Sequence, residues 1–292
     1  MCDKMKKYLI FTVASLLLML SCSTKKEKPG GLAGTPGEIK LITLDPGHFH
    51  AALVQKNSYE QVADEVYVYA PEGDDVQEHL NKINGYNMRA DSPTKWREVV
   101  YSGPDFLEKM LSEKKGNVMV TAGNNGKKTE YIKQTLMAGI HVLADKPMAI
   151  NSDNFGLLKE CFDIARQKGI LLYDIMTERH EITTILQREL SCIPAVYGEQ
   201  LQGTPEEPAI VKESVHHFFK VVSGNPLKRP AWFFDVTQQG EGIVDVTTHL
   251  VDLVQWEAFP GQIIDYKKDI ELIDANRWTT SISPEEFKQV TG

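Results

Sequence analysis

The sequence predicts an α/β protein whose first half is built around a parallel β-sheet. From Ile39 onward, short apolar runs alternate with stretches of helical periodicity. This strand–helix–strand alternation is typical of βαβ units, in which successive strands run parallel. The apolar runs also end in polar residues, as expected where ligands bind at the carboxyl edge of such a sheet. The fold class therefore already points to a binding edge.

The expected elements follow one another at regular spacing. Strands are predicted for the apolar runs at 39–44, 65–70, 117–123, 141–147 and 170–176. Helices are predicted for the amphipathic stretches at 50–59, 75–86, 104–115, 127–139 and 152–169. Ser152 is the expected N-cap of the last helix, and Gly169 is its expected stop.

Four strand ends should meet at one edge of this sheet because parallel strands all end on the same side. These ends are Asp45–His50, Thr121–Asn124, Asp145–Lys146 and Thr177–His180. From Ile182 the pattern changes to a helix followed by strand-like segments that contain proline. We therefore expect a parallel-sheet domain over 39–180 and a second, smaller domain of helices and strands over 181–292.

Composition limits the classes of function. The chain has 292 residues, of which 42% are hydrophobic, so it can bury the cores of two domains. Its net charge of −8 is spread without long runs, which argues against a nucleic-acid partner. The sequence leaves the oligomeric state open, a homo-oligomer included.

The first residues have the pattern of an export signal. Lys4, Lys6 and Lys7 precede an apolar run that is too short to span a bilayer comfortably. The residues before Cys22 resemble a bacterial lipobox, which implies that Cys22 is lipidated. We expect a signal peptide over 1–22 and a flexible, basic tether over 23–38, which favours a periplasm-facing membrane anchor in the cell envelope. An uncleaved anchor helix is the alternative.

One candidate chemical group follows the strand predicted at 141–147. Asp145, Lys146 and Pro147 place an ammonium group at the ligand edge, and the proline restricts the backbone after it. A lysine beside a desolvated pocket has a lowered pKa and can polarise a hydroxyl or share its proton. A plain surface lysine after a strand is the alternative.

A second candidate group lies in the stretch 240–256. In a helix that begins near Val244, Asp245, His249 and Asp252 share one face, and the other faces are apolar. Burying such groups is costly unless they are paired, so we expect these three to contact one another. An imidazole oriented by a carboxylate is a general base near neutral pH. A purely structural His–Asp pair is the alternative.

These stretches together resemble the glucose–fructose oxidoreductase and inositol dehydrogenase family (Gfo/Idh/MocA). That family carries E-K-P after its fifth strand, a helical D-x-x-x-H-x-x-D and a T-P-N-like strand end. The matching residues here are Asp145–Pro147, Asp245, His249 and Asp252, with a partial match at Thr121–Asn124. The order and spacing of the motifs agree from about Ile39 to Trp256.

The resemblance implies that 39–180 is a Rossmann-type doubly wound sheet that binds NAD or NADP and that 181–292 is a partial α+β domain with an open sheet. It also implies oxidation of a small carbohydrate, which is a sugar, glycoside or polyol. It implies that Lys146 polarises the reacting hydroxyl, that His249 takes its proton and that Asp245 orients either the substrate or His249. It places His217, Trp232 and Asp252 at the substrate pocket. Because free nicotinamide cofactor is scarce outside the cytoplasm, we expect the cofactor to be held tightly.

The phosphate loop departs from the family pattern, because D-P-G-H-F-H lacks two of its glycines. We interpret it as a modified nucleotide site in which Gly47 still allows close approach at a helix N-terminus. Ala70 stands where the ribose-binding acid is expected, so Glu72 is the candidate. The full set of predicted cofactor residues is Asp45, Gly47, His48, His50, Glu72, Thr121, Asn124, Asp145 and Lys146.

Three other functions stay open. Some members of the family use NAD to oxidise a sugar transiently and cleave its glycosidic bond by elimination. A metal-dependent hydrolase would use His48 and His50 with His216, His217 or His249 as ligands, although the lysine at position 146 favours the oxidoreductase and no metal is expected. A non-catalytic lipoprotein with a decayed nucleotide site is the third. The family's second sheet is also longer than the sequence after Trp256, so this chain looks short at its C-terminus.

Overall fold

A computed structural model describes residues 31–215, 217–222 and 225–292 of the chain. The predicted signal peptide, the lipidation site Cys22 and the candidate ligand His216 lie outside these residues. Within the described ranges, no helix combines the length and apolar character needed to cross a bilayer.

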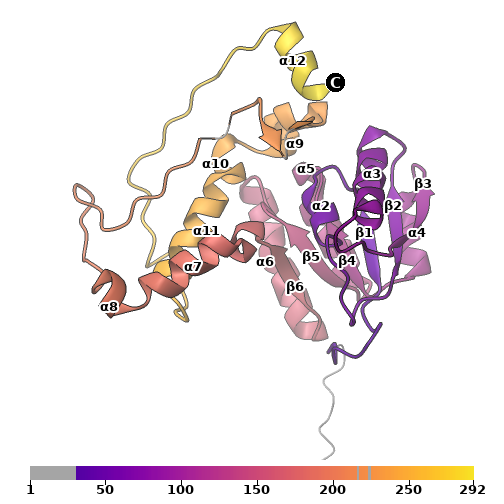
Figure 1. Ribbon diagram of the computed structural model, residues 1–292, viewed down its shortest axis with the longest axis horizontal. Coiled ribbons are helices and arrows are strands. Elements are labelled where there is room, and N and C mark those ends of the chain that lie inside the picture. Colours follow the sequence, from indigo (N-terminus) through magenta and orange to yellow (C-terminus); the bar gives the residue numbers. More distant parts are fainter. Residues whose placement is uncertain (1–30, 216, 223–224) are drawn as a thin grey trace, which may run out of the picture. The chain divides into compact units, whose positions relative to one another are not determined.

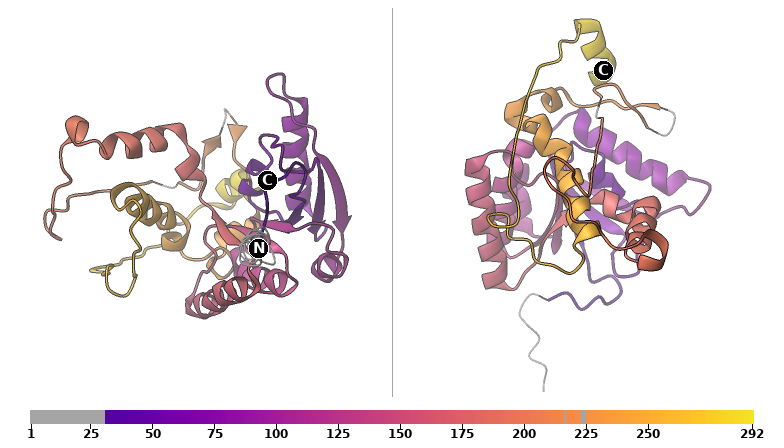
Figure 2. Two further views of the ribbon diagram at one scale, coloured as in Figure 1. Left: turned by 90° about the horizontal axis from the view of Figure 1, so that it is seen from below. Right: turned by 90° about the vertical axis from the view of Figure 1, so that its left-hand side faces the viewer.

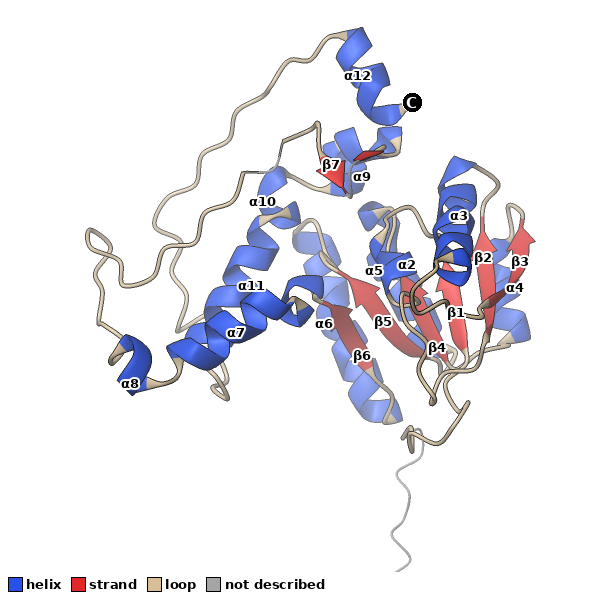
Figure 3. Cartoon of the chain, viewed as in Figure 1, coloured by secondary structure: helices blue, strands red, loops and turns tan. Residues whose placement is uncertain are grey.

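A six-stranded parallel sheet forms the first half of the described chain, in the order β3-β2-β1-β4-β5-β6. This order runs from right to left in Figure 1, and the strands are red in Figure 3. The predicted doubly wound fold class is confirmed. The strands are β1 (Leu41–Leu44), β2 (Glu65–Ala70), β3 (Arg97–Ser102), β4 (Val118–Thr121), β5 (His141–Asp145) and β6 (Leu172–Ile175).

Strand β3 was not expected from the sequence. It pairs with β2 residue for residue, from Arg97 opposite Glu65 to Ser102 opposite Ala70. None of its residues is buried, because it lies at the edge of the sheet. A solvated edge strand lacks the buried apolar face that makes the other strands recognisable.

Helices cover both faces of the sheet, and each face has its own apolar core. On one face, Met110, Ile132 and Cys161 pack against Ile42 and Leu44 of β1. On the other, Ala52 and Ile83 pack against Leu41, Val66 and Val120. The helices of the first face are α4 (Phe106–Glu113), α5 (Asn125–Met137) and α6 (Ser152–Lys168), and those of the second are α2 (His50–Leu53) and α3 (Asp74–Met88).

Two details of these helices differ from expectation. Helix α2 ends at Leu53, although the sequence predicted helix to residue 59. The N-cap of α6 is Asn151, whose side chain accepts a hydrogen bond from the Asn154 N–H, and Ser152 is the first helical residue. Gly169 ends α6 in the left-handed conformation (φ 66°), as predicted.

The second part of the described chain is helical and loop-rich. The stretches 199–220 and 260–283 contain no described helix or strand, and the later one leads to α12 (yellow in Figure 2). The strands described there, β7 (Val221–Val222) and β8 (Asn225–Pro226), pair antiparallel. The helical elements are η1 (Thr177–His180), α7 (Ile182–Ser191), α8 (Pro194–Tyr197), η2 (Ala231–Phe234), α9 (Val236–Gln239), α10 (Gly242–Asp245), α11 (Thr247–Ala258) and α12 (Pro284–Thr291).

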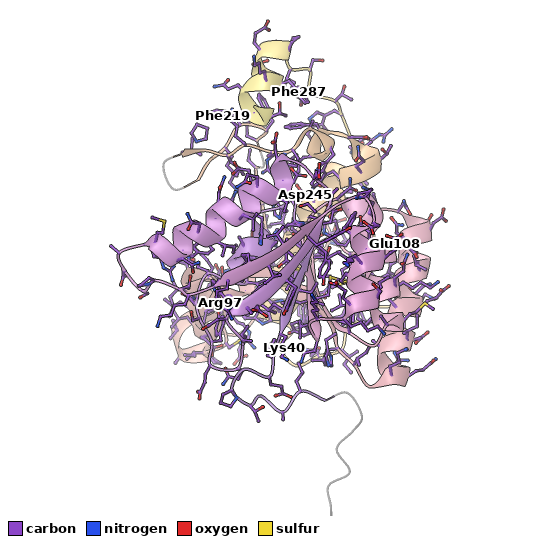
Figure 4. The ribbon with its side chains drawn as sticks, turned by 90° about the vertical axis from the view of Figure 1, so that its right-hand side faces the viewer. Lys40, Arg97, Glu108, Phe219, Asp245 and Phe287 are labelled. Atoms are coloured by element: carbon purple, nitrogen blue, oxygen red, sulfur yellow. The ribbon has the colours of Figure 1, made fainter. Side chains whose placement is uncertain are left out.

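This second part meets the sheet at the carboxyl ends of its strands. In Figure 4, Lys40 and Arg97 mark the starts of β1 and β3, and Asp245 lies beyond the opposite end of the strands. The predicted ligand edge is therefore the edge that α10 approaches.

Candidate functional site

The loops after β1 and β4 interlock at the carboxyl edge. The backbone N–H groups of Gly47 and His48 both donate to the Ala122 carbonyl, at 3.0 and 2.9 Å. Gly123 has no room for a side chain, because a Cβ there would lie 2.2 Å from the Asp45 carbonyl oxygen. These contacts use two backbone N–H groups that were predicted to bind a diphosphate. The helix that follows them, α2, is only four residues long. These two N–H groups are therefore not available to a diphosphate in this structure, and the binding of a diphosphate at this loop stays a prediction.

One carboxylate binds both histidines of the modified loop. His48 Nδ1 lies 3.0 Å from Asp145 Oδ2, and His50 Nδ1 lies 2.9 Å from Asp145 Oδ1. Asp145 is 2% exposed, at the end of β5. The structure thus joins the first and fifth strand ends, which the sequence predicted to be neighbours at the edge but not to be bonded.

Protonation follows from these contacts. Burial alone would raise the pKa of the Asp145 carboxyl, but the hydrogen bonds from His48 and His50 hold that pKa well below its usual range. Burial lowers the pKa of His48 to about 4 although its bond to Asp145 opposes this. At neutral pH, His48 is therefore uncharged, with its Nδ1–H on Asp145, so its free Nε2 is a hydrogen-bond acceptor rather than a diphosphate donor.

The same three residues are spaced as metal ligands. One ligand atom from each of His48, His50 and Asp145 lies within 4.8 Å of the others. Two ammonium groups act on this cluster, because the charge of Lys146 lowers the pKa of His48 and the charge of Lys128 interacts with Asp145. Adjacent cations oppose the binding of a divalent ion, so the geometry favours a hydrogen-bonded cluster over a metal centre.

The predicted lysine pairs with the predicted aspartate. Lys146 Nζ donates to Asp245 Oδ1 and to the Asp245 carbonyl oxygen, each at 2.8 Å. Both residues are buried, so water does not screen this ion pair. Lys146 is therefore not the plain surface lysine that its stretch of sequence also allowed.

The other predicted contacts on the helix face are wrong. The helix is interrupted at Val246, so Asp245 ends α10 and His249 belongs to α11. Asp252 forms a two-point ion pair with Arg179 of η1 and does not reach His249. This pair links α11 to η1, which follows β6, so the carboxylate expected in the substrate pocket is bound to Arg179 in this structure.

His249 lies in a buried position near several charged groups. Its side chain is 11% exposed, and Nε2 lies 3.8 Å from Glu178 Oε1, which is longer than a hydrogen bond. Its ring centre lies 6.5 Å from that of His50. Burial, aided by the charges of Lys146 and His50, lowers the pKa of His249 to about 4. The imidazole is uncharged at neutral pH and is able to accept a proton.

A cavity of about 510 Å³ adjoins these groups. It lies against the loop after β1, the loop between β2 and α3, and the segment 227–233. Such a volume is typical of a small-molecule or cofactor site. His48 and Trp232 line this cavity and also a small recess that contains Lys146, Asp145 and Asp245. The recess and the cavity therefore share one wall.

Trp232 lies at the modified loop, where the sequence had not placed it. Its indole Nε1 donates to Asp75 Oδ2 over 3.0 Å. A Cβ built on Gly47 would lie 2.8 Å from Trp232 Cζ2 and 3.1 Å from Asp75 Oδ2. The missing side chain of Gly47 therefore allows the close approach of the indole, and the predicted approach of a diphosphate to Gly47 stays a prediction.

Other predicted site residues are spread along the edge. Glu72 is exposed and lines the cavity, and Thr121 is buried at the end of β4. Asn124 is the N-cap of α5 and donates to Gln238 Oε1. Asp45 accepts a hydrogen bond from Tyr131 and lines the cavity. His217 is exposed and lines neither cavity, so it does not stand where the substrate pocket was expected.

Two buried cations were missed by the sequence analysis. Arg229 is 5% exposed, lines the cavity and lies 4.0 Å from the centre of the Phe233 ring. Lys128 is 1% exposed, inside α5. Lys128 did carry a signal: it stands four residues before Ile132 and eight before Leu136, both fully buried on the same helix face.

Two family models match the chain. Residues 47–174 match the model described as "Oxidoreductase family, NAD-binding Rossmann fold". Residues 186–292 match the model described as "Putative oxidoreductase C terminal domain". No protein of curated function matches the sequence.

Solved structures show the same fold. A "putative oxidoreductase" from Parabacteroides merdae is 78% identical with a TM-score of 0.83, and the match covers 89% of this chain but 60% of that one. GenD2 of gentamicin A biosynthesis, solved in complex with NAD, is 15% identical with a TM-score of 0.51, over 79% of this chain and 56% of that one. A structure of a "putative oxidoreductase" from Thermotoga maritima is 16% identical with a TM-score of 0.52, and the match covers 75% of this chain and 58% of that one. The chain thus spans less than two thirds of each.

Proposed function

The chain belongs to the Gfo/Idh/MocA oxidoreductase family, and from this premise we propose that it is an NAD-dependent oxidoreductase acting on a hydroxyl group of a sugar, glycoside or polyol. The observation that carries the proposal is the buried ion pair between Lys146 and Asp245. It lies at the carboxyl edge of a nucleotide-binding fold, beside an uncharged His249 and next to a cavity of cofactor size.

The residues around the cavity fit a dinucleotide. Gly47 leaves space at the loop after β1, and the buried guanidinium of Arg229 supplies a cation for the diphosphate in place of the backbone N–H groups bound to Ala122. Trp232 would have to shift from Gly47 as the cofactor enters. Glu72, Asp74 and Asp75 line the cavity just after β2. Carboxylates at that position bind ribose hydroxyls and repel a 2′-phosphate, which favours NAD over NADP.

The site residues support an alcohol oxidation. Bound NAD would supply the acceptor for the hydride. Lys146 would exchange one of its hydrogen bonds to Asp245 for one to the substrate hydroxyl oxygen, which stabilises the negative charge that develops there. The imidazole of His249 would take the hydroxyl proton, since it is uncharged at neutral pH. The hydroxyl-bearing carbon loses a hydride and becomes a carbonyl carbon.

We further propose that Cys22 anchors the protein to a membrane of the cell envelope, facing the periplasm. A reduced cofactor released there would not be recycled by cytosolic metabolism. We therefore propose that the cofactor is held tightly and is reoxidised on the protein, by a second substrate or within one catalytic cycle. The second option is the one that NAD-assisted cleavage of a glycoside would use.

The test is a turnover assay with added NAD and a panel of polyols, free sugars and nitrophenyl glycosides. Reduced nicotinamide or a keto-sugar product indicates net oxidation, and released nitrophenol without reduced nicotinamide indicates cleavage by transient oxidation. Lys146→Ala should abolish either signal, and Lys159→Met, an exposed lysine on α6, should not. Turnover that survives Lys146→Ala would refute the proposed site.

A further inference from the structure

Lys128 is a fully buried lysine whose ammonium group has a complete set of partners. Its Nζ donates to Asn125 Oδ1 at 2.5 Å and to the carbonyl oxygens of Asp145 and Pro147, each at 3.1 Å. An ammonium group has three N–H bonds, so these three acceptors use all of them. Lys128 is therefore not available to a substrate or a cofactor, and its role must be exerted through its neighbours.

Two of its partners are the carbonyl groups on either side of Lys146. The next residue of α5, Thr129, donates its hydroxyl to the Met148 carbonyl at 2.6 Å. Side chains of α5 thus hold the backbone carbonyls of residues 145, 147 and 148. The direction in which the Lys146 side chain leaves the turn depends on this backbone, because the turn has no helix or strand hydrogen bonds of its own.

The third partner leads to the other half of the ion pair. Asn125 donates from Nδ2 to the carbonyl oxygen of Gln239 at 2.9 Å and to its Oε1 at 3.1 Å. Gln239 ends α9, and α10, which carries Asp245, begins three residues later. Lys128 is thereby bonded to the backbone that bears Lys146 and, through Asn125, to the segment that leads to Asp245.

The charge of Lys128 matches this position. Burial lowers its pKa to about 8, while the charges of Asp145 and Asp245 oppose that change and the charge of Lys146 adds to it. The ammonium group of Lys128 therefore interacts with the charges of two carboxylates and of one other ammonium group. Because a buried ammonium without acceptors is costly, the three acceptors of Lys128 favour the arrangement of the backbone that keeps all three hydrogen bonds.

We propose that Lys128 is a positioning residue that sets Lys146 against Asp245, and so aligns the sheet with the helix that carries the proposed catalytic groups. The inference rests on the proposed role of Lys146 in the reaction. Without Lys128, the turn at residues 145–148 and the end of α9 lose their common anchor, and Lys146 leaves Asp245 for part of the time.

The test is competitive labelling of lysines with acetic anhydride, followed by peptide mass spectrometry, in the wild type and in Lys128→Met. Methionine is an unbranched side chain that is one atom shorter than lysine and has no hydrogen-bond donor. We expect acetylation of Lys146 to rise by about tenfold in the variant, as its hydrogen bonds to Asp245 open, while that of the exposed Lys159 stays unchanged. Thr129→Val removes only the bond to Met148 and leaves the link through Asn125 to α9 intact, so it should raise the acetylation of Lys146 by less than Lys128→Met does.

Unchanged labelling of Lys146 in folded Lys128→Met would overturn the inference. An equal rise at Lys212, which pairs with Glu257 in the helical part, would also overturn it, because it would show general loosening. If Lys128→Met does not fold, Lys128→Gln, which keeps an amide donor, replaces it under the same criteria. The assay needs neither cofactor nor substrate, so failure of the proposed function would not alter its outcome. Once a substrate is found, Lys128→Met should lower kcat with little change in the NAD dissociation constant.

Discussion

His48, from the loop after β1, donates its Nδ1–H to the carboxylate of Asp145 at the end of β5, over 3.0 Å. The same carboxylate binds His50, so one buried side chain bonds to both histidines of the loop that replaces a glycine-rich phosphate loop. The stability of this edge of the sheet should therefore depend on the charge of Asp145.

Asp145→Asn tests that dependence. The amide can accept one imidazole N–H but presents an N–H₂ to the other imidazole, which must change tautomer to accept it, and the charge-assisted character of both bonds is lost. We expect a loss of about 3 kcal/mol in the free energy of unfolding, measured with urea. Asp163→Asn, at an exposed residue of α6 paired with Arg166, should change it by less than about 0.5 kcal/mol. Equal effects of the two substitutions would show that the hydrogen bonds of Asp145 to His48 and His50 do not contribute to the stability of the fold.

Lys146 and His249 should be required for turnover. Replacing either by alanine removes a hydroxyl-binding cation or a proton acceptor, and we expect a fall of ~10²–10⁴ in kcat. Circular dichroism should show an intact fold, and the NAD dissociation constant should change little. A variant that keeps nearly full kcat on the true substrate would remove its residue from the catalytic assignment.

Burial of His249 has a consequence for pH. Its pKa in the folded protein, about 4, lies below the ordinary value of 6.5, so the unfolded chain binds more protons in the interval between them. The contribution of His249 to stability is complete above that interval and is lost as the pH falls through it. When the pH falls from 7 to 5, we expect this single group to lower the free energy of unfolding by about 2 kcal/mol.

The comparison to make is urea unfolding of wild type and His249→Gln at both pH values. On acidification from pH 7 to pH 5, the free energy of unfolding of the variant should fall by about 2 kcal/mol less than that of the wild type. The same protonation predicts that the acid limb of kcat/KM that belongs to His249 lies near its folded-state pKa of about 4. Identical pH dependence of the two proteins would show that His249 is not buried as an uncharged group.

Arg229 should contribute to cofactor affinity. A buried guanidinium in the wall of the cavity attracts a diphosphate, and Arg229→Met removes that attraction while keeping an apolar side chain beside Phe233. We expect the NAD dissociation constant to rise by about tenfold or more in isothermal titration. Lys228→Met, at the exposed neighbour on the same wall, should raise it by less than about threefold. If the two variants bind NAD equally well, the diphosphate is held elsewhere.

The sequence predicted most of the sheet because buried strands and helices carry strong periodic patterns. It missed β3, whose exposed edge position removes that pattern. It placed Lys146 and Asp245 at one site from two separated motifs, and the structure brings them into contact. The role of these residues stays a prediction.

The partners of the site residues were harder to predict. A straight helix would have put Asp245, His249 and Asp252 together, but the break at Val246 and the competing cation of Arg179 separate them. Lys128 and Arg229 were missed because a buried cation looks like a surface cation until its acceptors, which are distant in sequence, are known. Long-range pairing of polar groups depends on tertiary structure, which local patterns do not report.

The central claim is that NAD binds in the cavity beside the loop at residues 45–49. Its most direct test is isothermal titration of NAD into the purified chain and into Gly47→Ala, whose added methyl group would occupy the space beside this loop that NAD enters once Trp232 has shifted. We predict binding of one NAD per chain, weakened by about tenfold or more in Gly47→Ala and unaffected in Gly85→Ala, where a Cβ meets nothing within 4 Å. Absence of NAD binding, together with stoichiometric zinc that is lost on His48→Ala, would contradict the account and favour the metal-dependent alternative.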